Sequence, residues 1–362
     1  MRPRSTQPAR RPRPAALPAL LLALVLPLAG GCATPIGVER ADPQAVHREL
    51  TGNVLSTGEL SDFTANVLRR AALDELAGRD PAAALAELHA TGAAEAWARP
   101  EELFALAELS FRHAEDTGQP AHHLAAAVYA FAYLFPDGPG EAAPSPFDPR
   151  FRWAADLYNR GLTRAFDSAA DGAAFEPRGG TFALPFGTLE VAFDPADLLW
   201  DGRRLGSFVP VADLQVRGLN NRYRWPGLGA PLAAGTESLR PEQGFQVGPR
   251  VKVPVTALLL LDQPRRQLSA GRLRGSLRLV AATDDEPVSI AGRTVPIEVE
   301  PTAALAYTLS DPAAWQTELR GFLRGDLLGD RPTNLGAMQP HRPGRFPVVF
   351  VHGTASSVGR WA

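Results

Sequence analysis

Apolar residues recur at helical spacing through the first half of the chain, between about residues 59 and 170. Four segments follow this pattern and are predicted as helices: Asp62 to Leu76, Glu101 to Glu115, His122 to Phe135 and Phe151 to Phe166. Asp80 and Pro81 mark the start of another helix, because Asp caps free backbone N–H groups and Pro fits the first turn. We therefore expect a helical domain over residues 59–170.

The predicted helix that begins at His122 is more apolar than its neighbours and mixes small and large side chains. Alanines lie beside four aromatic residues: Tyr129, Phe131, Tyr133 and Phe135. Small residues let helices approach closely, so this composition favours a helix–helix core over a ligand pocket.

Two histidines, His122 and His123, stand at the start of that helix. Adjacent residues on a helix point about 100° apart, so the two imidazoles cannot comfortably share one metal ion. His113 and Glu115 lie nearby in the sequence, but their spacing matches no metal-binding motif. We expect solvated histidines near a turn and no metal site.

After about residue 178 the pattern changes to short, β-branched segments separated by Gly, Pro and Asp turns. The predicted strands are Thr181 to Leu184, Thr188 to Phe193, Gly206 to Val211, Val251 to Asp262, Gly275 to Thr283, Val288 to Ile290 and Thr294 to Glu300. Strands at this spacing are typical of a mostly β module, and we predict a sandwich-like domain over residues 178–310. The Gly- and Pro-rich stretch from Asn220 to Leu232 is interpreted as a structural turn, with a binding loop as the alternative.

The last segment, residues 311–362, begins with a helix signal and ends with a strand and a turn. Asp311 and Pro312 occupy the N-cap and first helical positions of the predicted helix. The β-branched run from Phe346 to Val351 predicts a buried strand. It stops at His352-Gly353-Thr354, a Gly turn in which a backbone N–H can face a developing negative charge.

Composition narrows the class of protein. The chain of 362 residues is 45% apolar and 21% charged, as in globular proteins. Five arginines and no acid lie in residues 1–31, so the remainder is more acidic than the formal net charge of −2. An acidic body gives no electrostatic reason to expect a nucleic-acid partner. No motif for a cofactor is present, and Lys252 is the only lysine.

Residues 1–31 have the layout of a secretion signal. A basic segment precedes an apolar stretch from Ala15 to Ala29, which is too short and too interrupted by prolines to span a membrane comfortably. Cys32 is the only cysteine, so an intramolecular disulfide and a cysteine-based metal site are excluded.

The residues that precede this cysteine, Leu28-Ala29-Gly30-Gly31, resemble a bacterial lipobox, although Leu28 stands four residues before Cys32 where the usual pattern has three. The resemblance implies lipidation of Cys32, export, and anchorage to the cell envelope through residues 32–58 as a tether. Ala33 is similar to the outer-membrane pattern of Gram-negative lipoproteins. An ordinary signal peptide with an incidental cysteine is the alternative.

The segment RFPVVFVHGTASSVGRW, from Arg345 to Trp361, resembles the first strand and oxyanion turn of the lipase and esterase branch of α/β hydrolases. It is similar to bacterial lipoproteins of that superfamily, in which a long N-terminal region precedes the hydrolase domain, and the likeness covers roughly residues 180–362. The resemblance implies that Thr354 supplies the oxyanion N–H and that His352 and Gly353 shape the turn. The paired helices of residues 59–170 resemble tetratricopeptide-like hairpins.

A serine nucleophile is missing from the sequence. An α/β hydrolase needs G-x-S-x-G followed by an acid and a His, and no serine here has glycines at both positions. Ser356 and Ser357 follow the turn and suit helix capping. We therefore expect the N-terminal part of a membrane-anchored serine ester hydrolase that acts on esters or lipids, with its catalytic triad beyond residue 362. The alternative is a non-catalytic lipoprotein module, whose helical domain binds a protein partner.

Replacing Cys32 with Ser is expected to release the protein from the membrane fraction, because no other segment of the sequence is apolar enough to span a membrane. Fractionation of cells followed by a high-salt wash measures this. A variant that stays membrane-bound after the wash would contradict lipidation at Cys32.

Overall fold

The computed structural model of the chain describes residues 36–138, 140–141, 143–168, 174–239, 251–282 and 288–310. It also gives the backbone of residues 246–247 and 336–337 and the separate positions 344, 346 and 348. Two compact units are distinguished, residues 1–49 and residues 50–362. In the second unit a helical segment precedes a mostly sheet segment, so the predicted α+β class is confirmed.

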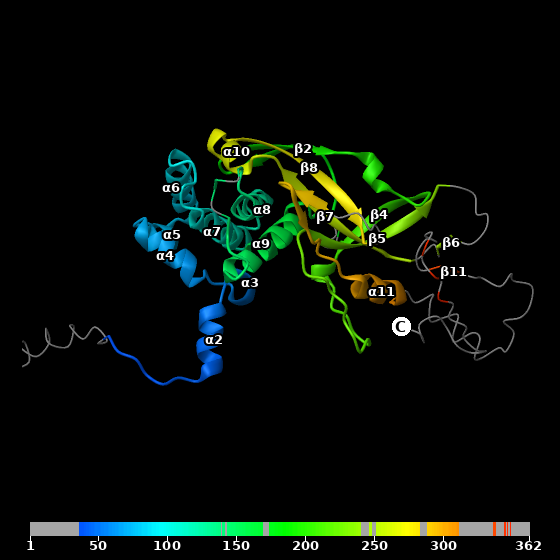
Figure 1. Cartoon of the computed structure of the whole chain (residues 1–362), viewed down its shortest axis with the longest axis horizontal. Helices are drawn as coiled ribbons and strands as arrows, with labels where there is room; N and C mark the ends of the chain where they lie inside the picture. Colours follow the sequence, from blue (N-terminus) through cyan, green and yellow to red (C-terminus); the bar gives the residue numbers. More distant parts are fainter. Residues whose placement is uncertain are drawn as a thin grey trace, which may run out of the picture. The chain divides into compact units, whose positions relative to one another are not determined.

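The helical segment of this unit runs from α3 to α9 (Figure 1). The helices described before the sheet are α2 (Pro43–Thr51), α3 (Val54–Thr57), α4 (Asp62–Arg70), α5 (Asp74–Arg79), α6 (Pro81–Ala94), α7 (Glu101–Thr117), α8 (Pro120–Leu134) and α9 (Pro149–Ala165). The predicted start of α6 is confirmed: the Asp80 carboxylate accepts a hydrogen bond from the N–H of Ala83, and Pro81 occupies the first turn.

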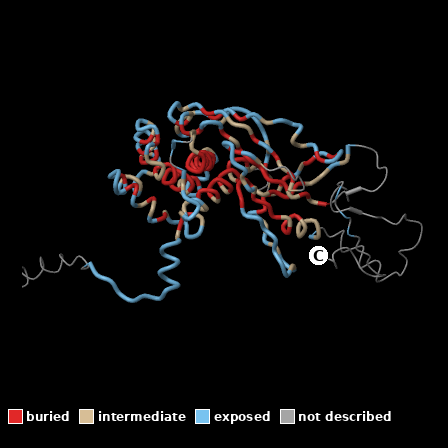
Figure 2. Tube along the Cα trace, viewed as in Figure 1, coloured by how far each residue is buried: buried red, intermediate tan, exposed pale blue. Residues whose placement is uncertain are grey.

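Helix α8 is the centre of the helical segment, and every residue from His122 to Leu134 is buried. Helices α7 and α9 pack along it, and β1 and α10 also contact it. Figure 2 shows the buried residues gathered in this helix and in the adjoining sheet. Gly161 of α9 lies so close that a Cβ there would be 2.7 Å from the carbonyl oxygen of His123. The predicted close helix packing around α8 is therefore confirmed.

The helix predicted from Asp62 to Leu76 is two helices, α4 and α5, and that prediction was wrong. Between them Ala72 adopts a left-handed conformation, with φ of 56°. The N–H of Leu73 then bonds to the carbonyl of Leu68, at 2.8 Å, in the capping pattern that usually carries Gly at the left-handed position. The turn buries Leu73. The sequence gives no sign of the break between the helices, because alanine stands at the position where glycine is usual.

In the described part of residues 32–58, where the sequence predicts a tether, the chain forms helices α2 and α3. Asn53 caps α3 through reciprocal hydrogen bonds with residues of its first turn, and Gly58 ends it with φ of 80°. A helix of four residues is too short to show apolar periodicity, which is why the pattern did not predict it.

Glu108 of α7 is fully buried and joins α3 and α4 to that helix. Its carboxylate accepts hydrogen bonds from the N–H groups of Val54 and Ser61, at 3.0 and 3.1 Å. It also accepts from the hydroxyls of Ser61 and Thr64, at 2.7 and 2.5 Å. A carboxylate is tolerated in a core only when its oxygens accept such bonds, so this contact sets where α4 begins. The N-cap of α4 is Ser61, one residue before the predicted Asp62.

The following strands form one seven-stranded mixed sheet in the order β1-β2-β8-β7-β5-β4-β3. Their bounds are β1 Gly180–Leu184, β2 Gly187–Phe193, β3 Leu199–Trp200, β4 Arg203–Pro210, β5 Ala230–Ser238, β7 Val253–Leu261 and β8 Arg272–Ala281. Strands β2 and β8 are parallel neighbours, and the other neighbouring pairs are antiparallel.

The predicted sandwich requires two large facing sheets, and the described residues form one large sheet against which helices pack. Helices α8, α9, α10 (Pro264–Ala270) and α11 (Pro301–Leu309) contact its strands. Two small two-stranded pairings accompany it: β9 (Val288–Ile290) with β10 (Arg293–Val295), and β6 (Gln246–Val247) with β11 (Gly336–Ala337). The apolar faces of the helices take the place of a second sheet.

Strand β5 and helices α10 and α11 were not predicted. The β5 sequence, APLAAGTES, lacks β-branched alternation, yet the strand is central because β7 and β4 pair with its two edges. The strand predicted from Thr294 to Glu300 is shorter than expected, since only Arg293–Val295 is a strand. Ile297 and Val299 instead form isolated bridges with Leu228 and Trp225.

Most of the segment predicted after residue 311 lies outside the described residues, including the helix that begins at Asp311. Of the strand predicted from Phe346 to Val351, only Phe346 and Val348 are described. Neither is assigned to a strand, and their side chains are 95% and 75% exposed.

Side chains from the helices pair with backbone groups of the sheet segment. The Tyr158 hydroxyl donates to the carbonyl of Leu259, at 2.8 Å, and accepts from the N–H of the same residue, at 2.7 Å. Trp97 Nε1 donates to the carbonyl of Arg265, at 2.9 Å. Residues of both segments belong to one hydrophobic core. The sequence predicted separate domains over residues 59–170 and 178–310, and these contacts join the two segments in the structure.

Replacing Tyr158 with Phe is expected to lower the free energy of unfolding by about 1–3 kcal/mol, because both polar groups of Leu259 lose their buried partner. The phenyl ring still fills the same space, so no cavity is added. Urea unfolding measures the change. The matched control, Tyr223→Phe at an exposed tyrosine, should change stability by less than about 0.5 kcal/mol, and equal stabilities of the two variants would contradict the role of Tyr158.

Candidate functional site

The residues that the sequence predicted to carry chemistry, Cys32 and the turn His352-Gly353-Thr354, lie outside the described residues. Among the described helices, none combines the length and apolar character needed to cross a bilayer. In the same part of the chain, no group of three or more His, Cys, Asp or Glu side chains is placed to hold a metal ion. The candidate site must therefore be sought in the cavities of the described part.

Two of the hollows in the described part of the chain have similar volumes, and one lies in each segment. The hollow of about 340 Å³ in the helical segment is lined by residues of α4, α5 and α7. Its charged side chains include Arg112, which is 3.0 Å from Glu59 and 4.0 Å from Asp116. The hollow of about 360 Å³ in the sheet segment has a different lining: among the described residues, neither Arg204 nor Lys252 has an ion-pair partner there. We take the second hollow as the candidate site and call it the Lys252 pocket.

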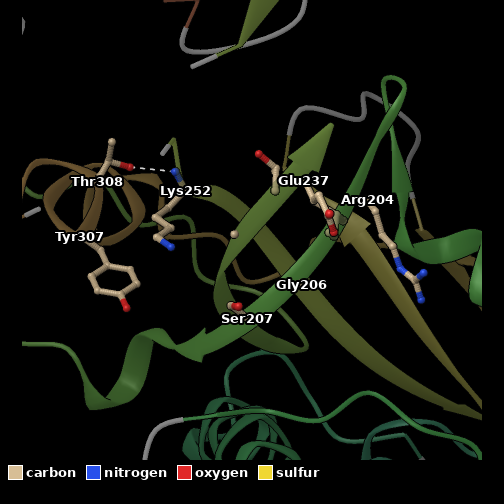
Figure 3. Close-up of a pocket in the computed structure, with 10 residues that line it drawn as sticks. Arg204, Gly206, Ser207, Glu237, Lys252, Tyr307 and Thr308 are labelled. Carbon is tan, nitrogen blue, oxygen red and sulfur yellow. Dashed lines mark hydrogen bonds between the residues drawn. The ribbon is translucent and has the colours of Figure 1, made fainter. Parts of the chain in front are cut away.

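The Lys252 pocket lies where strands β4, β5 and β7 meet helix α11 (Figure 3). Antiparallel pairing places Arg204 opposite Glu237 and Gly206 opposite Gly235, so these four residues share one face of the sheet. Lys252 immediately precedes β7. The remaining lining residues are Leu205, Ser207, Thr236, Tyr307 and Thr308.

Lys252 is held in place from two sides. Its backbone N–H donates to the hydroxyl of Thr308, at 2.9 Å, and that hydroxyl donates to the carbonyl of Ala304 within α11. Its ammonium group lies 5.0 Å from the centre of the Tyr307 ring. No carboxylate among the described residues lies within ion-pair distance of this ammonium. The charge of Lys252 is therefore positioned by α11 and left available to a ligand.

Ser207 enters the pocket because strand β4 is irregular at that residue. The pairing of β4 with β5 shifts between Gly206 and Val209, which is a β-bulge. Ser207 adopts a left-handed conformation, with φ of 48°, which is uncommon for a residue other than glycine. Bulges re-aim side chains, and here the bulge presents the Ser207 hydroxyl on the pocket side (Figure 3).

The side chains of the Lys252 pocket are suited to binding an anion. Lys252, Ser207 and Tyr307 offer hydrogen-bond donors, and among the described residues the lining contains no histidine that could activate Ser207 as a nucleophile. Arg204 and Glu237 lie on its other side (Figure 3). Sequence reasoning missed this pocket. The only signal for it was the single lysine in a chain whose other basic residues, apart from histidine, are arginines.

The histidines at the start of α8 are not solvated, so that prediction is corrected. His122 and His123 are only 8% and 6% exposed. Burial lowers the pKa of both to about 4, with a further contribution from His113 for His122 and from Arg164 and Arg160 for His123. His123 is therefore neutral at pH 7, and its 3.5 Å contact with Glu115 is not an ion pair at that pH.

His89 of α6 lies where the helical segment meets the first hairpin of the sheet. Its Nδ1 is 2.8 Å from the Tyr129 hydroxyl, and its ring stacks on Phe186 with centroids 4.8 Å apart. Trp97 meets the same ring edge-on, at 5.3 Å. Burial lowers the pKa of His89 to about 4, so it acts as a neutral aromatic ring in this contact.

Comparisons of the chain with protein-family models, with curated proteins and with solved structures found no match.

The stability of the protein is expected to fall as the pH is lowered from 6.5 towards 4. In the unfolded chain, histidines take up protons near pH 6.5, whereas folded His89, His122 and His123 stay neutral until about pH 4. Each histidine thus contributes stability that is present above pH 6.5 and is lost within this window at no more than about 1.4 kcal/mol per pH unit, and at less for the half-buried His89. Urea unfolding at a series of pH values measures the slope.

His123→Phe should flatten this pH dependence. The new ring can keep the edge-on contact with Phe111, which now has a centroid distance of 5.2 Å. The matched control, His47→Gln, changes an exposed histidine. If both variants show the slope of the parent protein, buried His123 is not a source of the acid sensitivity.

Proposed function

We propose that this chain is the N-terminal part of an exported, lipid-anchored serine ester hydrolase. One observation carries the proposal: the apolar run from Phe346 to Val351 is followed directly by His352-Gly353-Thr354. In the α/β hydrolases that this segment resembles, such a strand and turn aim a backbone N–H at the oxyanion of the reacting ester.

Thr354 is the oxyanion donor in this proposal, through its backbone N–H. One such donor typically contributes about 3 kcal/mol of transition-state stabilisation. The nucleophile, the acid and the base come from residues beyond Ala362, because no serine of the chain lies in G-x-S-x-G. Lipidation at Cys32 would hold the enzyme at a membrane, which favours esters and lipids of the envelope as substrates.

The helix–sheet unit is the non-catalytic part of the proposed enzyme. The described lining of its Lys252 pocket holds a serine but no histidine, and a serine nucleophile needs such a base beside it. The helical segment is proposed to bind a protein partner.

A non-catalytic lipoprotein that binds a ligand is the second candidate, and the available donors of the Lys252 pocket favour it. The two candidates differ in the coding sequence past codon 362. A G-x-S-x-G motif within the next hundred or so codons supports the hydrolase, and a stop codon supports the binding module.

The 362-residue chain alone is expected to hydrolyse no activated ester above the solution background, because a donor without an attacking group has nothing to stabilise. A nitrophenyl ester assay measures this. Serine-reagent-sensitive activity of this chain would overturn the assignment of the nucleophile to later residues.

In the longer protein, Thr354→Pro should lower turnover by about a hundredfold or more, because proline has no N–H to donate. Thr354→Ala keeps the N–H and is the control for the loss of the side chain. If the alanine variant loses as much turnover as the proline variant, the N–H of residue 354 is not the oxyanion donor.

A further inference from the structure

We propose that the Lys252 pocket binds a phosphate group, with the ammonium of Lys252 as its charged contact and the hydroxyls of Ser207 and Tyr307 as further donors. This inference concerns residues other than those of the proposed oxyanion turn and does not depend on the hydrolase proposal.

The first support is the convergence of unused donors. Among the described residues, the Lys252 ammonium has no ion-pair partner, and the hydroxyls of Ser207 and Tyr307 have no hydrogen-bond partner. A Cβ built on Gly235 would lie 3.5 Å from Lys252 Nζ and 3.5 Å from Ser207 Cβ. Two of the three donor side chains therefore reach the same spot on the sheet, and Tyr307 stands beside Lys252 (Figure 3).

The second support is the space that two facing glycines keep open. Gly206 and Gly235 are opposite each other on β4 and β5 and both line the pocket. A Cβ on Gly206 would meet no atom within 4 Å. Any larger residue at either position would project into the hollow, so the sheet leaves room for a ligand next to Lys252.

The third support is the backbone of Ser207. A left-handed conformation at a residue other than glycine costs of order 1 kcal/mol and persists only where the surrounding structure holds it. Such residues cluster at ligand sites. Here the conformation accompanies the bulge that carries the serine hydroxyl to the pocket.

The chemistry of the donors favours phosphate over carboxylate. Lysine is a common phosphate ligand and binds as a compact point charge, without the fixed two-pronged geometry of a guanidinium. A tetrahedral phosphate offers oxygens in several directions, which can satisfy an ammonium and two hydroxyls on different elements. The volume of about 360 Å³ admits a phosphate with a small organic group attached.

The single lysine allows a direct test on the full chain. Labelling with ¹³C-lysine gives one Cε resonance, and it belongs to Lys252. Inorganic phosphate, added at constant ionic strength, is expected to shift this resonance saturably, whereas chloride should not. A shift of the same size and midpoint with acetate would overturn the preference for phosphate.

Gly206→Val fills the pocket and preserves the lysine probe. It is expected to weaken phosphate binding by about tenfold or more. The matched control is Gly138→Val, because Gly138 lies outside the pocket and a Cβ there also meets nothing within 4 Å. Unchanged binding in the Gly206 variant would place phosphate elsewhere.

Calorimetry with inorganic phosphate tests the charge. Lys252→Met should lower the affinity by about tenfold or more, and Lys252→Arg should retain part of it. Arg79→Met removes an exposed charge outside the pocket and should leave the affinity unchanged. An equal loss in the Lys252→Met and Arg79→Met variants would overturn a specific site.

The phosphate could come from a soluble ester or from a phospholipid headgroup, and two arms separate these sources. Glycerol phosphate is titrated in one arm, and vesicles of phosphatidylglycerol are added in the other, each with the parent chain and Lys252→Met. Binding that depends on Lys252 in the first arm supports a soluble ligand, and in the second arm a headgroup. Absence of Lys252-dependent binding in both arms and with inorganic phosphate refutes the proposal.

Discussion

The structure of the second unit depends on one constraint: where helices cover the sheet, buried backbone groups must still find hydrogen-bond partners. Strand β5 pairs with β7 only as far as Ala257, and Leu259 lies beyond this point. The Tyr158 hydroxyl acts as both donor and acceptor for Leu259, and so takes the place of the missing strand neighbour. Next to it, Asn159 donates to the carbonyl of Gly227 at 3.1 Å and accepts from the N–H of Gly229 at 2.6 Å. Two consecutive residues of α9 thus satisfy the backbone on which the helices rest.

Buried carboxylates also accept hydrogen bonds from backbone N–H groups at two other places where segments meet. Glu108 gathers the starts of α3 and α4 onto α7, and Glu298 binds α9 and the segment before β5. Glu298 accepts from the N–H of Gly227 at 2.7 Å and from the side chains of Arg152 and Arg224. Removing a single partner of a buried charge leaves it uncompensated, so these networks stabilise one arrangement of the segments at the expense of others.

The two proposals assign different roles to different parts of the chain. Ester hydrolysis is attached to His352-Gly353-Thr354 and to residues that follow the chain, whereas phosphate recognition is attached to the Lys252 pocket of the described unit. The contacts that form the pocket lie among the described residues. Helix α11 holds Lys252, a bulge presents Ser207, and paired glycines leave the space between them. A lipid-anchored protein with both features would hold a phosphate-bearing molecule through residues other than those of its oxyanion turn.

The sequence by itself determined the elements whose signals are local. Apolar periodicity predicted α7, α8 and α9, Asp80 and Pro81 marked the start of α6, and β-branched runs predicted β2, β7 and β8.

Only the tertiary structure decided features that depend on distant partners. Helix α4 is separated from α5 by an alanine in the left-handed conformation, and burial of Leu73 offsets the strain of that conformation. Strand β5 is central because β4 and β7 both pair with it, although its sequence is only weakly β-prone. His122 and His123 carry no local mark of burial, since α7 and α9 cover them only after folding. The Lys252 pocket could not be predicted for the same reason: its residues come from β4, β5, the start of β7 and α11, and long-range pairing alone brings them together.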